Sequence, residues 1–337
     1  MFMMILMKNL VDFIARNVLL LCLVTLTACA EVPRERVFDE FILVKTEDSD
    51  SLASIAATYL NNAEKDWQIA QFNHITALSP GQDLIIPLRP FEWGGIRQDG
   101  YQVVPVLTYY GFSRENTGKR IVSEAAFKAQ MKFLKVKGYR VISLDQLVDF
   151  LEFKVQIPEK SVAITFDDGW RSVYDIALPI LKTHGYPATL FVRTDFIGKK
   201  NAMSWDQVGL LTENGFDIQC KTVTNPDMSR LKDAASFMAT FRAIQKEITQ
   251  SKKIVKNKLN RECRYLAYAC GKTNNIVIAL LKKEGFRAAF TMQRGSNPFF
   301  VNNYMIHRSV IHGGFDMGQF KKNLSVFIPD TVDSSSH

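Results

Sequence analysis

Cysteine and histidine are both scarce in this sequence. Five cysteines and five histidines occur in 337 residues, and no two of the histidines have the His-x-x-x-His spacing of a metal-ligand pair. Cys22 and Cys29 lie near the N-terminus, which leaves Cys220, Cys263 and Cys270 in the rest of the chain. An odd set of three predicts no disulfide framework.

Internal repeats and long apolar runs are also lacking. The one low-complexity tract is a short Ser run near the end, so a repeat architecture is excluded. The composition is 47% hydrophobic and 23% charged, which is typical of a globular protein with one medium domain and additions. The net charge of +8 suits anionic glycans or a membrane surface. A solvated basic surface is the simpler alternative, and without a binding motif we expect no nucleic acid partner.

The N-terminus has the features of an export signal. In residues 1–28 two basic residues precede an apolar run, Val18 to Leu26, that is too short to span a bilayer. Leu26 to Cys29 (LTAC) resembles the lipobox of bacterial lipoproteins. The resemblance implies cleavage before Cys29, a lipid on Cys29 and a membrane anchor. Because Ala30 rather than Asp follows, it also implies an outer-membrane location facing the periplasm. A plain signal peptide with an incidental Cys29 is the alternative.

Residues 41–88 are predicted to form a small separate unit. Their pattern predicts a strand at Phe41–Val44, a helix opening at Ser51, a helix at Trp67–Phe72 and a strand at Leu84–Pro87. This β-α-α-β order, with "SLASIAATYL" and "IAQFNHITALSPGQDLIIP", resembles a LysM domain. The resemblance implies binding to N-acetylglucosamine-containing glycans such as peptidoglycan, although Asp48 to Ser51 replace the usual Gly-Asp-Thr. A LysM-like spacer is the alternative. Residues 89–100 are predicted to be a linker.

Residues 101–328 alternate between apolar β-rich runs and amphipathic helical runs. Strands are predicted at Val103–Tyr109, Arg140–Ser143, Ser161–Phe166, Ala188–Val192, Phe216–Cys220, Tyr265–Tyr268, Arg287–Thr291 and Met305–Ile311. Helices are predicted at Glu124–Lys137, Val173–His184, Trp205–Asn214, Ala234–Leu259 and Ile276–Glu284. The pattern predicts parallel strands with helical crossovers, and so an α/β domain. In an α/β barrel, chemistry lies at the carboxyl ends of the strands.

Two adjacent acids follow the apolar strand "SVAITF". Asp167 and Asp168 repel each other, so each needs a cation or a proton. One of them can act as a general base while its neighbour holds a metal ion. The motif Thr165 to Gly169, with Trp170 after it, is therefore the first candidate site.

The motif "ITFDDGW" resembles the first motif of the polysaccharide deacetylases (NodB-homology, family 4 carbohydrate esterases). "VPVLTYYGFS", "YPATLFV", "MSWDQVGLL" and "LAYACG" match further family segments in order. The resemblance implies a distorted (β/α) barrel that hydrolyses N-acetyl groups of an N-acetylglucosamine polymer, in exopolysaccharide or peptidoglycan. It implies that Asp167 is the base and that Asp168 binds a divalent metal, Zn or similar. It also places Tyr110, Trp170, Tyr268, Cys270 and Gly271 along the substrate.

The sequence departs from the family at the metal ligands. Lys221 and Asn225 stand at the two His positions of the second motif, and Tyr110 stands where a His is common. The third motif reads Tyr268 to Gly271 (YACG) instead of ending in Pro-Tyr-Gly. Lys must lose a proton to ligate, and an amide is a poor ligand for zinc. We therefore predict that the Lys221 ammonium pairs with Asp168 and that the site holds no metal.

Four further residues are candidates for the same face of the domain. Cys220 and Cys270 follow strands, where they could bind a metal, join in a disulfide or simply fill space. His307 could protonate the leaving amine, or be structural. Arg308 could contact a carboxylate of the site.

Three functions are consistent with these residues. The first is a polysaccharide deacetylase that uses Asp167 as base. The second is a catalytically impaired, deacetylase-like protein that binds glycan through the barrel and the LysM-like unit. The third is an assembly lipoprotein whose barrel docks proteins, for which the predicted anchor is the specific support.

Overall fold

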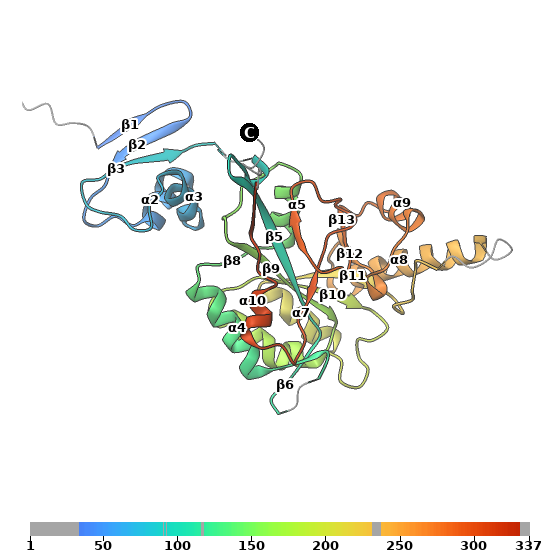
Figure 1. The fold of residues 1–337 in the computed structure, drawn as a ribbon. Coiled ribbons are helices and arrows are strands. Elements are labelled where there is room, and N and C mark those ends of the chain that lie inside the picture. The colour runs from blue at the N-terminus through green and yellow to red at the C-terminus, as the bar shows by residue number, and fades with distance from the viewer. Residues whose placement is uncertain (1–33, 90, 92, 116–117, 231–236, 331–337) are drawn as a thin grey trace, which may run out of the picture. The chain divides into compact units, whose positions relative to one another are not determined.

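The computed structural model describes residues 34–330 apart from 90, 92, 116–117 and 231–236 (Figure 1). The chain divides into two compact units, the first of which ends at Arg89. The predicted signal peptide and Cys29 lie outside the described residues. Within the described part of the chain, no helix combines the length and the apolar character needed to cross a bilayer.

The first unit is a three-stranded antiparallel sheet with two helices. Its strands pair in the order β1 (Glu35–Val37), β2 (Phe41–Lys45) and β3 (Asp83–Pro87), and its helices are α2 (Leu52–Leu60), the 3-10 turn η1 (Ala63–Lys65) and α3 (Asp66–Phe72). Ser51 caps α2 by accepting a hydrogen bond from the Ser54 amide. The four elements that the sequence predicts are present, and β1 is additional. Their core consists of Ile42, Val44, Ile55, Ala56, Ile69, Leu84 and Ile86.

The second unit is built on a parallel sheet that is curled into a half-barrel. Its parallel strands run in the order β13 (Ala288–Phe290), β12 (Tyr265–Ala267), β11 (Phe216–Thr222), β10 (Ala188–Arg193), β9 (Ser161–Asp168) and β5 (Gly100–Tyr109). Strand β8 (Arg140–Val141) adds to β9 in parallel, and β15 (Ser309–Val310) adds to β5. Three short strands pair antiparallel with β5: β4 (Ile96–Arg97), β14 (Ser296–Pro298) and β16 (Phe327–Pro329). Strands β6 (Gly111–Ser113) and β7 (Ile121–Ser123) form a separate parallel pair.

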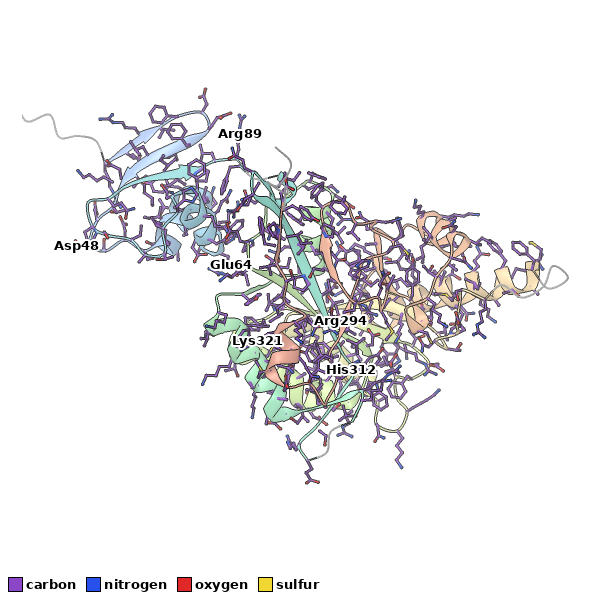
Figure 2. All side chains as sticks on the ribbon, viewed as in Figure 1. Asp48, Glu64, Arg89, Arg294, His312 and Lys321 are labelled. Atoms are coloured by element: carbon purple, nitrogen blue, oxygen red, sulfur yellow. A yellow bond between two sulfur atoms is a disulfide. The ribbon has the colours of Figure 1, made fainter. Side chains whose placement is uncertain are left out.

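Helices connect the parallel strands, as the alternating pattern predicts (Figure 1). They are α4 (Glu124–Val136), α5 (Leu144–Leu151), α6 (Leu178–His184), α7 (Trp205–Glu213), α8 (Phe237–Leu259) and α9 (Asn275–Lys283). A last helix, α10 (Met317–Lys321), leads to the antiparallel strand β16. A π-helix (Val173–Ala177) leads into α6, and 3-10 turns lie at Trp93–Gly95 and Ala269–Gly271. Side chains fill the space between the sheet and these helices (Figure 2).

The period-two alternation of the strands divides the core into two layers. Leu107, Tyr109 and Phe166 point to the face that packs against α4, α6, α7, α8 and α9. Val106 and Ala163 point to the other face, where they pack with α5 and with Phe290. Thr108 and Thr165 continue this second face, and their hydroxyl oxygens are 2.9 Å apart. Asp167 follows Thr165 on this face, so the candidate site lies at the end of the face.

Two sequence predictions are wrong in detail. The predicted linker, residues 89–100, contains β4, which pairs with the start of β5, so the segment joining the units is shorter than expected. The predicted strand Met305–Ile311 is reduced to β15, since the residues before it form a turn and a single bridge from Ile306 to Phe290. Edge segments such as these depend on pairing with distant residues, which periodicity does not reveal.

Candidate functional site

The two acids end strand β9. Asp167 and Asp168 are its last residues, and Asp168 has a φ of 75°, which is unusual for a residue with a side chain. Gly169 follows with a φ of 111°, and a Cβ there would collide with the Ile197 side chain. Two successive left-handed residues turn the chain sharply away from the sheet, and strain of this kind is common at functional sites.

Asp167 is fully buried and bound to two cations. Its Oδ1 accepts a hydrogen bond from Arg308 at 2.7 Å, and its Oδ2 accepts from Arg308 at 3.2 Å and from Lys221 Nζ at 3.1 Å. Burial disfavours the charge, but the two cations outweigh burial and lower the pKa of Asp167. The side chain is 0% exposed, so both oxygens serve the ion pairs rather than solvent.

Lys221 lies between the two acids. It comes from the carboxyl end of β11, and its Nζ is 2.7 Å from Asp168 Oδ1 as well as 3.1 Å from Asp167 Oδ2. Burial lowers the pKa of this ammonium, but the two carboxylates raise it further, and the net direction is upward. The Lys221 side chain is 2% exposed and Asp168 is 14% exposed. The predicted contact of Lys221 with Asp168 is confirmed.

Arg308 completes the cluster from the segment before β15. Its Nε donates to the Thr291 carbonyl at 2.9 Å, and its guanidinium lies 5.1 Å from the centre of the Phe191 ring. The predicted contact of Arg308 with a carboxylate is therefore confirmed, with Asp167 as its partner. Two acids and two cations meet at the carboxyl ends of the strands, where catalytic side chains of α/β barrels gather.

Known proteins resemble this chain over the region that contains the two acids. Residues 154–289 match the family model for polysaccharide deacetylase. The chain is 30% identical over 199 residues to the poly-beta-1,6-N-acetyl-D-glucosamine N-deacetylase of Staphylococcus epidermidis. The aligned region covers 56% of this chain and 68% of that enzyme. The chain belongs to the polysaccharide deacetylase family. The Staphylococcus aureus enzyme of the same name is 25% identical over 209 residues, 60% of this chain and 72% of that enzyme.

Solved structures show the same deacetylase fold. The Streptococcus pyogenes deacetylase PplD superposes with a TM-score of 0.60 at 22% identity, covering 66% of this chain and 98% of that one. IcaB from Ammonifex degensii superposes with a TM-score of 0.55 at 23% identity, covering 64% of this chain and 93% of that one. The half-barrel is thus the deacetylase fold, whereas these comparisons do not extend to the LysM-like resemblance of the first unit.

The donors at the acids do not fit the metal that the deacetylase family implies. Among the described residues no group of three or more His, Cys, Asp or Glu side chains could hold an ion. Lys221, at the first ligand position, has a raised pKa and keeps its proton. Asn225, at the second, has a φ of 63°, and its buried Oδ1 has no hydrogen-bond partner within the part of the chain that the structure describes. An ammonium and an amide are poor ligands for zinc.

Tyr110, at the third position where the family often has a His, is also buried. Its hydroxyl donates to Met292 Sδ at 3.4 Å, and its ring lies 5.6 Å from Lys221 Nζ and 4.8 Å from the Arg120 guanidinium. Burial, with the nearby charge of Asp167, raises the pKa of Tyr110 to about 12. Tyr110 thus helps to enclose the ammonium, and its predicted contact with substrate stays a prediction.

The third-motif residues form a tight turn after β12. Tyr268 is buried, and its hydroxyl donates to the Tyr304 carbonyl at 2.9 Å. Cys270 has a φ of 55°, and a Cβ at Gly271 would come 2.5 Å from the Met292 amide nitrogen, so the turn packs closely against the strand after it. Their predicted substrate contacts are not tested by this geometry.

His307 lies next to Arg308 but faces different neighbours. A Cβ at Gly295 would lie 2.7 Å from His307 Nδ1, and Asn297 exchanges hydrogen bonds with the His307 backbone at 2.8 and 3.1 Å. Burial lowers the pKa of His307, which favours the neutral ring. Its role as an acid stays a prediction.

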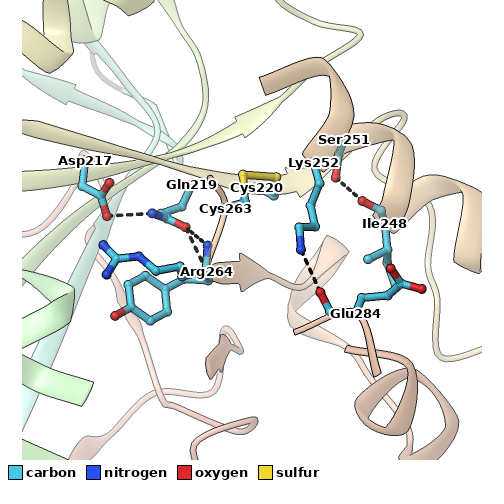
Figure 3. Close-up of a disulfide and its surroundings, with 10 residues drawn as sticks. Asp217, Gln219, Cys220, Ile248, Ser251, Lys252, Cys263, Arg264 and Glu284 are labelled. Atoms are coloured by element: carbon cyan, nitrogen blue, oxygen red, sulfur yellow. Dashed lines mark hydrogen bonds between the residues drawn. A yellow bond between two sulfur atoms is a disulfide. The ribbon is translucent and has the colours of Figure 1, made fainter. Parts of the chain in front are cut away.

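The cysteine predictions need correction. Cys220 lies within β11 and forms a disulfide with Cys263, just before β12, with the two Cα atoms 5.7 Å apart (Figure 3). Cys270 is free and exposed. The predicted alternatives of a Cys220–Cys270 disulfide and of a thiolate metal site using Cys220 are therefore wrong. The expectation of no disulfide among the three cysteines is also wrong, because the pairing of Cys263 depends on strand order and not on cysteine number or spacing.

A cavity of about 440 Å³ is lined by residues that follow the Asp-Asp-Gly turn, and neither acid is part of its lining. Trp170 and Ser172 line it together with residues of β6 and β7. Its lining includes Phe112, Ser113, Trp170, Arg171, Asp175 and Asn201. An aromatic surface bordered by hydroxyl, amide and charged groups is typical of a site for a polar ligand with apolar faces. Of these residues the sequence singled out only Trp170.

Proposed function

We propose that this chain is a glycan-binding member of the polysaccharide deacetylase family, with a polymer of N-acetylglucosamine as its ligand. The relatives from two staphylococcal species are named as deacetylases of poly-beta-1,6-N-acetyl-D-glucosamine. The fold is that of the solved deacetylase structures, and the residues matched by the family model, 154–289, include the two acids.

The cavity lined by Trp170, two residues after Asp168, carries this proposal. A sugar ring has apolar faces that stack on an aromatic side chain, and hydroxyl and acetamido groups at its rim. Trp170 and Phe112 offer the aromatic surface, and Ser113, Asn201 and Asp175 offer hydrogen-bond partners.

Binding without ordinary hydrolysis is supported by the state of Asp167. A general base needs a carboxylate oxygen within reach of the water whose proton it takes. Both Asp167 oxygens are instead bound to Arg308 and Lys221, and the side chain is fully buried.

Hydrolysis is the second candidate function, favoured by the strained end of β9. Both acids of the family motif are present, Asp168 is in part exposed, and it has a φ of 75°. In this scheme Asp167 takes a proton from the water molecule whose oxygen bonds to the acetamide carbonyl carbon. The C–N bond then breaks, and the proton passes to the leaving amine nitrogen as acetate is released.

Location at the cell envelope is also part of the proposal. The predicted lipid anchor at Cys29 would hold the chain at a membrane, in the outer membrane facing the periplasm, and the LysM-like unit would bind peptidoglycan or a related polymer. The Cys220–Cys263 disulfide supports an oxidising compartment, because such bonds are rare in the cytosol.

The test combines binding and acetate release on the full chain. Wild type, Trp170→Ala and Asp167→Ala are titrated with poly-β-1,6-N-acetylglucosamine oligomers, and acetate is measured with and without Zn, Co or Ni. We expect binding without acetate release, and an affinity at least about tenfold weaker in Trp170→Ala. Phe300→Ala is the matched control, since Phe300 is an aromatic residue 63% exposed and outside the cavity lining. Acetate release that disappears in an Asp167→Ala variant with an unchanged circular dichroism spectrum would establish hydrolysis instead, and a wild type that neither binds glycan nor releases acetate would overturn both.

A further inference from the structure

We infer that the Lys221 ammonium permanently occupies the place of the catalytic metal ion, so that the site carries its own cation and takes up no divalent metal. The contacts that carry this inference are those of Lys221 Nζ, 2.7 Å from Asp168 Oδ1 and 3.1 Å from Asp167 Oδ2. Asp168 is the residue that the family resemblance assigns to the metal.

Space is the first reason. A zinc ion binds a carboxylate oxygen at about 2.0–2.2 Å, and the ammonium nitrogen already lies 2.7 Å from the Asp168 oxygen. An ion on that oxygen and the ammonium would overlap unless Lys221 withdrew. Lys221 is 2% exposed, and it lies at the end of β11, a strand paired on both sides with β10 and β12. Withdrawal would therefore require movement of the surrounding core.

Charge is the second reason. Asp167 and Asp168 supply two negative charges, and Lys221 and Arg308 supply two positive ones within hydrogen-bonding distance. The buried cluster is already neutral. A divalent ion would leave two uncompensated positive charges in a region of low dielectric, which is strongly unfavourable.

Asn225, at the second ligand position, is as poorly suited to binding zinc as Lys221 at the first. Asn225 lies four residues after Lys221, in the loop that leaves β11, and its backbone amide donates to Thr222 Oγ1 at 3.0 Å. Its buried Oδ1 has no partner among the described residues. A single amide oxygen does not compensate for the lost imidazoles. The ammonium is thus the element that blocks the site, and Asn225 is the ligand position that a histidine could refill.

If the ammonium blocks the site, substitutions that remove it and supply ligands should create a metal site. Replacing both residues, Lys221→His with Asn225→His, removes the ammonium and puts imidazoles at the two positions that the family resemblance assigns to His ligands, which with the Asp168 carboxylate make a three-ligand set suited to zinc. Asn225→His alone leaves the ammonium in place and should create no site. That single variant is the matched control, because it adds the same histidine to the same loop.

Zinc content is the measurement. The full chain and both variants are stripped with EDTA, dialysed against buffered zinc and analysed for metal per chain. We expect no stoichiometric zinc in the wild type or in Asn225→His, and about one zinc per chain in the double variant. Stoichiometric zinc in the wild type would overturn the inference, as would a double variant with an unchanged circular dichroism spectrum that takes up no more zinc than the wild type.

A second measurement tests the inference on the wild type alone, and so still applies if the double variant does not fold. The thermal unfolding temperature of the wild type is recorded in EDTA and in excess zinc. A ligand that binds the folded state raises this temperature, so we expect no difference, and a rise would overturn the inference. Both measurements are independent of glycan binding, so failure of the proposed function and failure of this inference remain distinguishable.

Discussion

At the scale of single residues, the site is dominated by four charged side chains that balance one another. Taking charges out of water is costly, and such a pair is stabilising only while every partner is present. Removing Asp167 would leave Lys221 and Arg308 as close buried cations. Loss of activity in a variant of Asp167 is therefore evidence about chemistry only when the variant is shown to be folded.

Asp217, on the same strand as Lys221, is a half-buried carboxyl that forms no salt bridge with any residue that the structure describes. Burial is the main cause that raises its pKa, and Asp145 adds to this. Gln219, whose Nε2 donates to Oδ2 at 2.8 Å (Figure 3), and Arg264 oppose it. An acid with a raised folded-state pKa stabilises the fold below its unfolded-state pKa of about 3.9, and this stabilisation is lost as the pH rises through the folded-state value. We therefore expect Asp217→Asn to need more urea for unfolding than the wild type near pH 7, with the difference vanishing toward about pH 3.

Asp99→Asn is the control for that measurement. The Asp99 carboxylate is 63% exposed and pairs with Arg97 at the surface, so its replacement should change the midpoint little at either pH. A lower midpoint for Asp217→Asn near neutral pH would show that the charged carboxylate is needed by its neighbours.

Part of the site could be read from the residues alone. Adjacent acids after an apolar strand need cations, and Lys221 and Arg308 stand near strand ends, so their contacts were predictable from charge. The position of Arg308 over Asp167 was not, because it depends on contacts of Arg308 with Phe191 in β10 and with the Thr291 carbonyl just after β13. The Cys220–Cys263 disulfide was missed for a related reason, since the register that brings the two residues together is not encoded by their spacing.

At the scale of elements, strand alternation places the charged cluster. Asp167 follows Thr165 by two residues and Lys221 follows Gln219 by two, so each continues the same face of its strand. Pairing of β9 and β11 with β10 sets Phe191 opposite both Asp167 and Gln219. A shift of one residue in either strand would turn its charge toward the apolar layer under α6 and α7.

The disulfide restrains the strand that carries Lys221. It links β11 to the residue before β12 across a sequence separation of 43 that includes α8. In the chain-entropy account, closing a loop of this length stabilises the fold by about 4 kcal/mol. We expect a variant with Cys220→Ala and Cys263→Ala to lose about that much free energy of unfolding in urea, to within a factor of two.

Cys270→Ala serves as the matched control, since Cys270 is free and exposed. Its stability should equal that of the wild type. A double variant as stable as the wild type would mean that the loop containing α8 is already ordered in the unfolded chain or that strain offsets the gain.

Long periodic elements were predictable, and short ones were not. The predicted helix Ala234–Leu259 corresponds to α8, whose buried stripe includes Ile244, Ile248 and Val255. Helix α5 was missed although Ser143 and Gln146 form a capping box at its start. Strands β14 and β16 are three residues each and exist through pairing with β5, which local pattern cannot reveal.

At the scale of the whole molecule, the chain has separate cores. The first unit has its own buried cluster around Ile69 and Leu84, and the second unit has two clusters on the faces of its sheet. Small units bury a smaller fraction of their surface and are correspondingly less stable. The two units are therefore expected to unfold in separate steps.

Calorimetry of the full chain tests this expectation. Two transitions should appear, and Ile69→Ala should lower only the first unit's transition, by roughly 10 °C or more, because Ile69 is fully buried and its truncation leaves a cavity in a small core. Ile248→Ala, at an equally buried position on α8, should lower only the second unit's transition. If either substitution moves both transitions together, the units share stabilising contacts, and glycan bound by one unit would then also stabilise the other.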